Sequence, residues 1–101
     1  MPSSFQSKCY ELLRRIPKGR VTTYKILAEA LDSRAYRAVG HAMAVNPDPI
    51  HTPCHRVVCS DGRTGQYAMG SDRKIALLRS EGVEIMQGRI LDFEKRLYHF
   101  D

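Results

Sequence analysis

A cysteine and a histidine stand next to each other in the stretch PIHTPCHRVV, which covers residues 49–58. A cysteine attacks as its thiolate, and a free thiol with a pKa near ~8.5 is mostly protonated at neutral pH. A neighbouring imidazole can accept the thiol proton, and cations can stabilise the resulting charge. The loop supplies His55, Arg56 and His51 for these tasks. Cys54 is therefore a candidate nucleophile, with His55 as its candidate base.

Catalysis of this kind also needs a carboxylate to orient the imidazole, and the pattern does not select one of the eleven Asp and Glu residues. Other interpretations of Cys54 stay open at this point. It can be an inert buried cysteine, or it can join His51, His55 and Cys59 in a zinc site, although HxxCHxxxC matches no common zinc finger. It can also form a redox pair with Cys59, although the C-x4-C spacing is not the C-x-x-C motif.

The chain of 101 residues is long enough for one small domain, and 16 Lys and Arg against 11 Asp and Glu give it a net charge of +5. This charge favours a polyanionic partner, nucleic acid first, over a merely soluble basic protein. The sequence contains no run of about 18 apolar residues and no secretory signal at its start. Three cysteines cannot all pair within one chain, so we expect reduced thiols and a cytoplasmic location.

Apolar periodicity predicts a first helix in SSFQSKCYELLRRIPKGR. Ser3 and Gln6 match a capping box, and Pro17 with Gly19 ends the segment. This spacing makes Cys9 a core residue rather than a reactive one. The predicted buried face contains Phe5, Cys9, Leu12, Leu13 and Ile16.

Two short helices follow, in VTTYKILAEALDS (21–33) and SRAYRAVGHAMAVNP (33–47). Thr22 or Thr23 can cap the first, Ser33 lies near the start of the second, and Asn46-Pro47 ends the second. Two short helices joined by a tight polar turn form a helix-turn-helix pattern. The Ala and Gly residues of the second helix allow close packing, against either the protein's own core or DNA. The predicted buried residues are Ile26, Leu27, Leu31, Ala38, Val39, Ala42 and Met43.

The rest of the chain predicts one more clear helix and a little β structure. RVVCS reads as a short strand, SDGRTG as a turn, and GSDRKIALLRSEG as a helix that ends at Gly82. A hairpin about Gly88 and a final helical turn complete a domain that is mainly α with a minor β element. The expected helix caps are Ser71 or Asp72, and the expected inward-facing side chains are Ile75, Ala76, Leu78, Phe93 and Leu97.

The segment PCHRVV, preceded by NPDPI and followed by CSDGRTGQYAMG, resembles the active-site segment of the 6-O-alkylguanine-DNA alkyltransferases. GRVTTYKILAEAL resembles the first helix of that family's helix-turn-helix, YRAVGHAMAVNP its recognition helix, and LLRSEGV the helix that closes its active site. The resemblance covers about residues 5–85. It implies a winged-helix-like helix-turn-helix fold, with residues 1–101 forming a single DNA-binding and active-site domain that lacks the family's N-terminal domain.

The resemblance also implies a chemistry. Cys54 would accept the alkyl group of 6-O-alkylguanine, and His55 would act as the base through a water. Glu81 would orient the imidazole, Tyr24 would donate a hydrogen bond to the leaving guanine, and Asn46 would hold the active-site loop. The thioether is not readily reversed, so each molecule would act once, without metal or cofactor.

The implied partner is double-stranded DNA that carries an alkylated guanine, bound in the minor groove by a monomer and associated with it in the nucleoid or nucleus. The lesion would be flipped out of the stack, with Arg37 filling the gap. Ala68 and Met69 stand where the family more often has small or hydroxylated residues, so we expect methyl groups to be preferred over benzyl. The DNA-binding residues would be Thr23, Tyr24, Arg34, Arg37, Ala38 and His41, and the pocket residues Met43, Val57, Tyr67, Ala68 and Met69.

Two other functions remain possible from the sequence. An alkyltransferase-like protein would bind alkylated DNA and signal to another repair pathway, but such proteins commonly replace the acceptor cysteine with tryptophan, and this chain has Cys54 and no tryptophan. A helix-turn-helix transcriptional regulator would read bases in the major groove. The predicted recognition helix offers few base-reading side chains beyond Arg34, Arg37 and His41.

Overall fold

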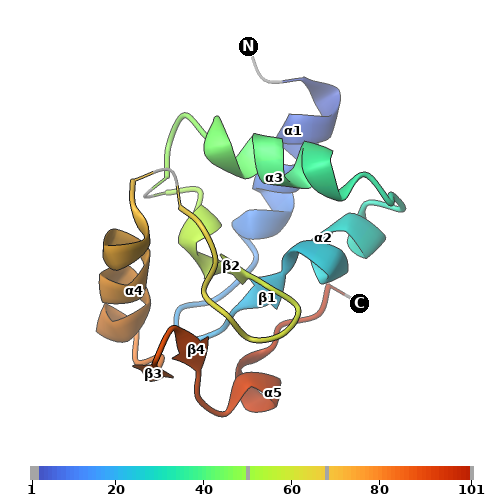
Figure 1. Ribbon diagram of the computed structural model, residues 1–101. Helices are drawn as coiled ribbons and strands as arrows, with labels where there is room; N and C mark the ends of the chain where they lie inside the picture. Colours follow the sequence, from blue (N-terminus) through green and yellow to red (C-terminus); the bar gives the residue numbers. More distant parts are fainter. Residues whose placement is uncertain (1–2, 50, 68, 101) are drawn as a thin grey trace.

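The computed structural model describes residues 3–49, 51–67 and 69–100. Helices form most of the secondary structure, and the short strands pair near the centre and at the lower edge of the view in Figure 1. The mainly helical fold with a minor β element is therefore confirmed. In chain order the elements are α1 (Ser4–Leu13), β1 (Thr22–Thr23), α2 (Tyr24–Ala30), α3 (Tyr36–Ala44), the 3-10 helix η1 (Cys54–Arg56), β2 (Val57–Val58), α4 (Ser71–Ser80), β3 (Ile85–Met86), β4 (Arg89–Ile90) and α5 (Phe93–Arg96).

Helix α1 begins at the predicted capping box. The Ser3 hydroxyl accepts a hydrogen bond from the Gln6 backbone at 3.1 Å, and the Gln6 side chain accepts one from the Ser3 backbone at 3.0 Å. Cys9 is fully buried in the core, as predicted. The pattern missed Tyr10, whose hydroxyl donates to the Ala42 carbonyl at 2.8 Å and so ties α1 to α3.

The helix-turn-helix consists of α2 and α3, which pack against each other. Thr23, and not Thr22, caps α2, because its hydroxyl accepts a hydrogen bond from the Ile26 backbone at 3.0 Å. Helix α3 starts at Tyr36, three residues after Ser33, whose hydroxyl instead holds the Ala35 backbone in the preceding turn. The predicted stripe on α3 is buried at Val39, Ala42 and Met43 and half-buried at Ala38.

A parallel pairing joins β1 to β2, with Thr22 opposite Val57 and Thr23 opposite Val58. The sequence did not predict β1, because a strand of two residues has no room for an alternating pattern. The pairing attaches the start of the helix-turn-helix to the segment that directly follows Cys54. Cys54 and Val57 belong to the core cluster formed with α1, α2 and α3, whereas Val58 belongs to a second cluster with Leu78 of α4.

Helix α4 confirms the predicted end and corrects the predicted start. Gly70 precedes the helix and no side chain caps it, so neither Ser71 nor Asp72 has the expected role. Ala76 is exposed, not inward-facing, and Lys74 is buried instead. The helix ends in a Schellman motif: Gly82, at φ +91°, donates to Arg79, and Val83 donates to Leu78. This motif places Glu81 at the C-cap.

The C-terminal segment folds back onto the start of the helix-turn-helix (Figure 1). β3 and β4 form the predicted hairpin, with Gln87 and Gly88 at positive φ in its turn. Beyond α5, the backbone of residues 96–98 pairs with Val21 through hydrogen bonds of 2.8 and 2.7 Å. Phe93 and Leu97 are half-buried, close to expectation.

None of the helices in the described ranges combines the length and the apolar character that crossing a lipid bilayer requires.

Candidate active site

Cys54 begins η1 and is only 3% exposed. The loop before it is held by Asn46 at the end of α3. The Asn46 amide donates to the Thr52 carbonyl at 2.8 Å, and its oxygen accepts from the Asp48 backbone at 3.0 Å. The Cys54 backbone donates to the same Thr52 carbonyl at 2.8 Å. Asn46 therefore fixes the backbone that presents the thiol, and it is the residue for which the sequence suggested a loop-holding role.

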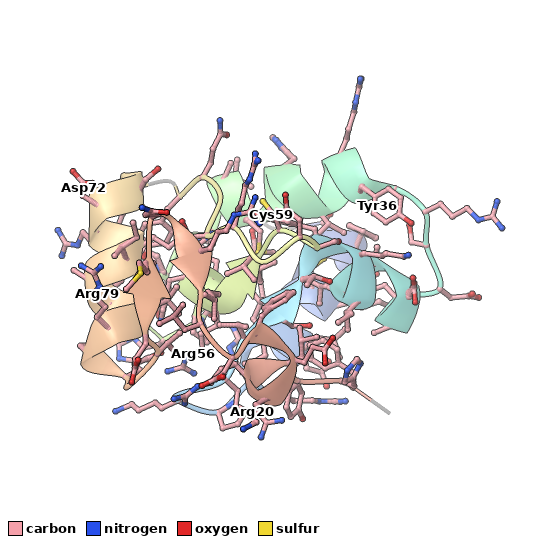
Figure 2. The ribbon with its side chains drawn as sticks, turned by 60° about the horizontal axis from the view of Figure 1, so that its bottom comes forward. Arg20, Tyr36, Arg56, Cys59, Asp72 and Arg79 are labelled. Atoms are coloured by element: carbon pink, nitrogen blue, oxygen red, sulfur yellow. The ribbon has the colours of Figure 1, made fainter. Side chains whose placement is uncertain are left out.

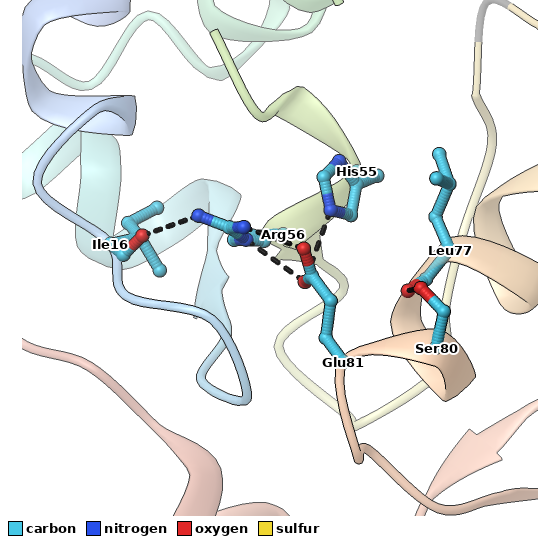
Figure 3. Close-up of polar contacts among 6 residues, drawn as sticks. All are labelled: Ile16, His55, Arg56, Leu77, Ser80 and Glu81. Atoms are coloured by element: carbon cyan, nitrogen blue, oxygen red, sulfur yellow. Dashed lines mark hydrogen bonds and ion pairs between the residues drawn. The ribbon is translucent and has the colours of Figure 1, made fainter. Parts of the chain in front are cut away.

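His55 and Arg56 both contact Glu81, which lies on the C-cap of α4 (Figure 3). The Nε2 atom of His55 lies 3.1 Å from Oε1 of Glu81. Arg56 donates to the two carboxylate oxygens at 3.0 and 2.5 Å, and its remaining arm donates to the Ile16 carbonyl at 2.6 Å. Among the acids in the described ranges, Glu81 is thus the one whose carboxylate contacts the His55 imidazole, and Arg56 in turn anchors Glu81.

The His55 ring has a buried Nδ1 atom for which the described residues supply no hydrogen-bond partner. Since Nε2 faces a carboxylate, the proton of the neutral ring is best placed on Nε2, which leaves Nδ1 as an acceptor. Burial lowers the pKa of His55, and the neighbouring Arg56 and Lys74 charges act in the same direction against Glu81. The ring is therefore neutral near pH 7 and carries a free base nitrogen.

The electrostatics of the thiol and the carboxylate follow from burial and from their partners. Burial raises the pKa of Cys54, although a hydrogen bond with Asn46 and the charge of Lys74 partly oppose it. Burial also disfavours the Glu81 carboxylate, but the hydrogen bonds from Arg56 and the contact with His55 outweigh it and lower the pKa of Glu81. The resting site accordingly pairs a protonated thiol with a neutral base and an ionised carboxylate.

Lys74 on α4 is a part of the site that the sequence reasoning missed. Its side chain is completely buried, and its ammonium donates to the carbonyls of Val57 at 2.7 Å and Gln66 at 3.0 Å. It also lies 5.9 Å from the centre of the Tyr24 ring. Burial lowers the pKa of Lys74 to about 8. The available signal was its position four residues before Leu78, which places a lysine on the apolar face of α4.

A cavity of about 610 Å³ opens beside Cys54. Burial raises the pKa of Tyr24 to about 12, so its hydroxyl keeps its proton and can donate a hydrogen bond into the cavity. The lining residues come from α2, α3, η1 and the segment after β2: Tyr24, Tyr36, Gly40, Met43, Ala44, Cys54, Cys59, Gly65, Gln66 and Tyr67.

The expected pocket residues differ in where they lie. Met43 and Tyr67 line the cavity, whereas the Val57 side chain is fully buried in the core and does not line it. Met69 is 42% exposed and does not line the cavity, but its sulfur accepts a contact of 3.8 Å from the hydroxyl of Tyr67, which does. Ala68 lies outside the described residues.

The residues expected to touch DNA also separate into two groups. Arg34, Arg37 and His41 are all exposed. Arg37 and His41 are four residues apart on the outer face of α3, whereas Arg34 lies in the turn before the helix begins at Tyr36. Ala38 is half-buried on the same helix. Thr23, in contrast, is buried and its hydroxyl is occupied in capping α2, so its side chain is not presented to a partner.

In the described part of the chain, no three His, Cys, Asp or Glu side chains are grouped in a way that could hold a metal ion. The zinc interpretation of His51, Cys54, His55 and Cys59 therefore has no geometric support there. His51 is exposed and pairs with Asp48, whereas His55 is buried against Glu81.

Comparison with known proteins supplies a family for this arrangement. The model of the 6-O-methylguanine DNA methyltransferase DNA-binding domain matches residues 4–83. A methylated-DNA–protein-cysteine methyltransferase of Thermococcus kodakarensis is 49% identical over 81 residues, which are 79% of this chain and 45% of the relative. A bifunctional methyltransferase/endonuclease of Picrophilus torridus is 47% identical over 96 residues, which are 94% of this chain and 32% of the relative.

Solved structures agree with the fold. Mycobacterium tuberculosis OGT in complex with DNA superposes with a TM-score of 0.78 at 37% identity, covering 81% of this chain and 51% of that one. Atl1 of S. pombe, in complex with damaged DNA containing O6-carboxymethylguanine, superposes with a TM-score of 0.83 at 32% identity, covering 97% and 98%. The chain spans a third to a half of the length of these two curated relatives. It belongs to the 6-O-methylguanine DNA methyltransferase family, of which it carries the DNA-binding domain.

Proposed function

We propose that this domain repairs 6-O-alkylguanine in double-stranded DNA by transferring the alkyl group irreversibly to Cys54. The observation that carries the proposal is a buried thiol on the wall of a cavity, in the residue before a histidine that is paired with a partly buried carboxylate. An inert structural cysteine does not need a cavity, and it does not need an oriented base beside it.

In the proposed reaction the thiol proton passes through a water to Nδ1 of His55, the atom that has no partner among the described residues. The thiolate sulfur then forms a bond to the alkyl carbon as the bond between that carbon and the guanine oxygen breaks. The imidazolium is stabilised by Glu81, whose charge Arg56 holds in place. The raised pKa of Cys54 makes this proton transfer necessary at neutral pH.

The departing guanine carries negative charge, and two groups of the cavity are suited to stabilise it. Tyr24 lines the cavity with a hydroxyl that stays protonated, because its pKa is raised to about 12. The Lys74 ammonium lies over the Tyr24 ring, 5.9 Å from its centre, and adds a positive charge close to the site. Donors held in position in a dry site stabilise developing charge without reorganising, which is often the largest contribution to catalysis.

The proposed DNA contact is the outer face of α3. Arg37 and His41 supply positive or polar groups there, and Arg34 adds a charge in the turn just before the helix. The first turn of α3 holds no acid. The start of the helix adds the positive end of its dipole, which favours phosphate. The small residues Ala38 and Gly40 allow a close approach to a groove. Arg37 would take the place of the flipped base.

A second candidate is a protein that binds alkylated DNA without accepting the alkyl group. The observation in its favour is that S. pombe Atl1 and this chain match over nearly the full length of both. The two functions differ in whether Cys54 is consumed.

The deciding experiment is a titration of a duplex bearing one labelled 6-O-methylguanine with increasing protein. The proposal predicts that label appears in protein and reaches a plateau at one methyl group per molecule. Cys54→Ser should abolish transfer, whereas the control Cys59→Ser should preserve it, because Cys59 lines the same cavity without the adjacent histidine. Lesion binding without transfer of label would support the second candidate instead.

A further inference from the structure

Tyr36 is an aromatic side chain that neither the core nor the proposed reaction explains. It is the first residue of α3 and is 46% exposed, and it is the one aromatic among the large apolar side chains that the described residues expose. It also lines the cavity that contains Cys54. Figure 2 shows it on the helix-turn-helix side of the molecule. A half-exposed ring at the edge of a cavity is available to contact what enters.

The spacing along α3 defines where this ring stands. Tyr36, Gly40, Met43 and Ala44 all line the cavity and fall at i, i+4, i+7 and i+8, so they form one face of the helix. Tyr36 is the first residue of that wall and Ala44 the last. Arg37 follows Tyr36 directly and is exposed on the outer face instead. The first turn of α3 therefore directs an aromatic ring to the cavity mouth and a guanidinium to the surface.

We infer that Tyr36 packs against the flipped nucleotide at the mouth of the cavity, on the deoxyribose side, and thereby slows its return to the stack. This inference rests on the proposed function, since it requires a nucleotide to enter the cavity. A guanine that reaches Cys54 keeps its deoxyribose nearer the opening of the cavity, where the half-exposed Tyr36 ring offers an apolar surface against which the sugar can pack. Flipping costs a few kcal/mol, so a contact made only with the extrahelical nucleotide raises the population of the reactive complex.

The test compares two substrates that differ in whether flipping is needed. One is a duplex with a single 6-O-methylguanine, and the other is the free base 6-O-methylguanine, which has no sugar. For Tyr36→Ala we expect the single-turnover rate on the duplex to fall about tenfold, a typical loss for removal of one aromatic contact with a nucleotide. We expect the rate on the free base to fall clearly less than the rate on the duplex, because the free base has no deoxyribose for the ring to contact and needs no flipping.

Two further variants keep the test specific. Tyr36→Phe keeps the ring and should keep the duplex rate. Val45→Ala is a matched control, because Val45 is also 46% exposed, follows the last turn of α3 and does not line the cavity. Equal losses on the duplex and on the free base, or an unchanged duplex rate for Tyr36→Ala, would overturn the inference.

A second measurement separates this inference from the proposed function. The preference of each protein for the lesion duplex over the plain duplex is measured by equilibrium binding, which does not require transfer. Tyr36→Ala should lower this preference about tenfold. If the wild-type protein transfers no alkyl group, the proposed function is overturned, and the binding preference still decides the role of Tyr36.

Discussion

The complete burial of Lys74 predicts how the free energy of unfolding changes with pH. Its pKa falls from 10.5 to about 8 on folding. Between these values the unfolded chain keeps the proton while the folded chain releases it. The free energy of unfolding therefore rises with pH across this window. The neutral amine still has two N–H donors, which match its two acceptors, the carbonyls of Val57 and Gln66.

The perturbation is Lys74→Met, which removes the charge and keeps an unbranched side chain. The fall from 10.5 to about 8 corresponds to about 3 kcal/mol. The wild-type protein should gain stability relative to the variant by up to about this amount between pH 8 and pH 10.5. Near pH 7 the two effects of the substitution oppose each other. The variant no longer buries a charge, but it removes the donor to the buried carbonyl of Val57, at about 1–3 kcal/mol, and to the part-buried carbonyl of Gln66, which water can partly replace.

The assay is urea unfolding of both proteins at several pH values from 7 to 10.5 under reducing conditions. The quantity of interest is the difference between their free energies of unfolding, in which contributions from other titrating groups largely cancel. Lys25→Met is the matched control, because it removes a lysine charge at an exposed position on α2. If the free energy of unfolding of the wild type, relative to that of Lys74→Met, stays constant or falls as pH rises, the pKa of Lys74 is not lowered by burial.

Three further predictions concern the site. Glu81→Gln leaves the Arg56 charge without its carboxylate in a largely buried network. We therefore expect the free energy of unfolding in urea to fall by about 3 kcal/mol and the single-turnover transfer to become slower. A variant that is as stable and as fast as the wild type would show that this network has neither role. Met69→Gly removes the side chain that contacts Tyr67 of the cavity wall, so we expect the transfer rate for benzyl groups to rise relative to that for methyl groups. If the wild-type protein already transfers both groups at equal rates, Met69 does not restrict the cavity. Arg37→Ala should slow transfer from duplex DNA about tenfold and spare the free base, and equal losses on both would remove it from the flipping step.

Much of the fold could be predicted from the sequence because local signals were strong. The capping box of Ser3 and Gln6, the hairpin turn at Gly88 and the helix end at Gly82 each depend on a few adjacent residues. The predicted capping of α4 was wrong, because a local signal can fit a position that the backbone does not use. Ser71 and Asp72 are good caps in general, but the backbone turns into the helix one residue earlier, at Gly70 with φ +100°.

The parts that could not be predicted depend on contacts between distant segments. The pairing of β1 with β2 joins residues 35 positions apart and leaves no periodic trace in two residues. The partner of His55 lies 26 residues away, and only the family resemblance suggested Glu81. The spacing of Lys74 to Leu78 places the lysine on the inner face of α4, but the carbonyls of Val57 and Gln66 that accept from its ammonium lie on other segments and leave no trace in that spacing. The place of Tyr36 on the cavity wall likewise depends on distant segments, because the other lining residues include Tyr24, Cys54 and Tyr67.

If Cys54 accepts the alkyl group irreversibly, the thiol is consumed in the reaction. The most direct measurement is the intact mass of the protein, followed by peptide mapping, after incubation with a duplex that bears one 6-O-methylguanine. We expect one added methylene group per molecule, located on Cys54 and absent from Cys54→Ala. An unchanged mass, together with tighter binding to the lesion than to plain duplex, would instead indicate a damage-binding protein whose thiol takes no part.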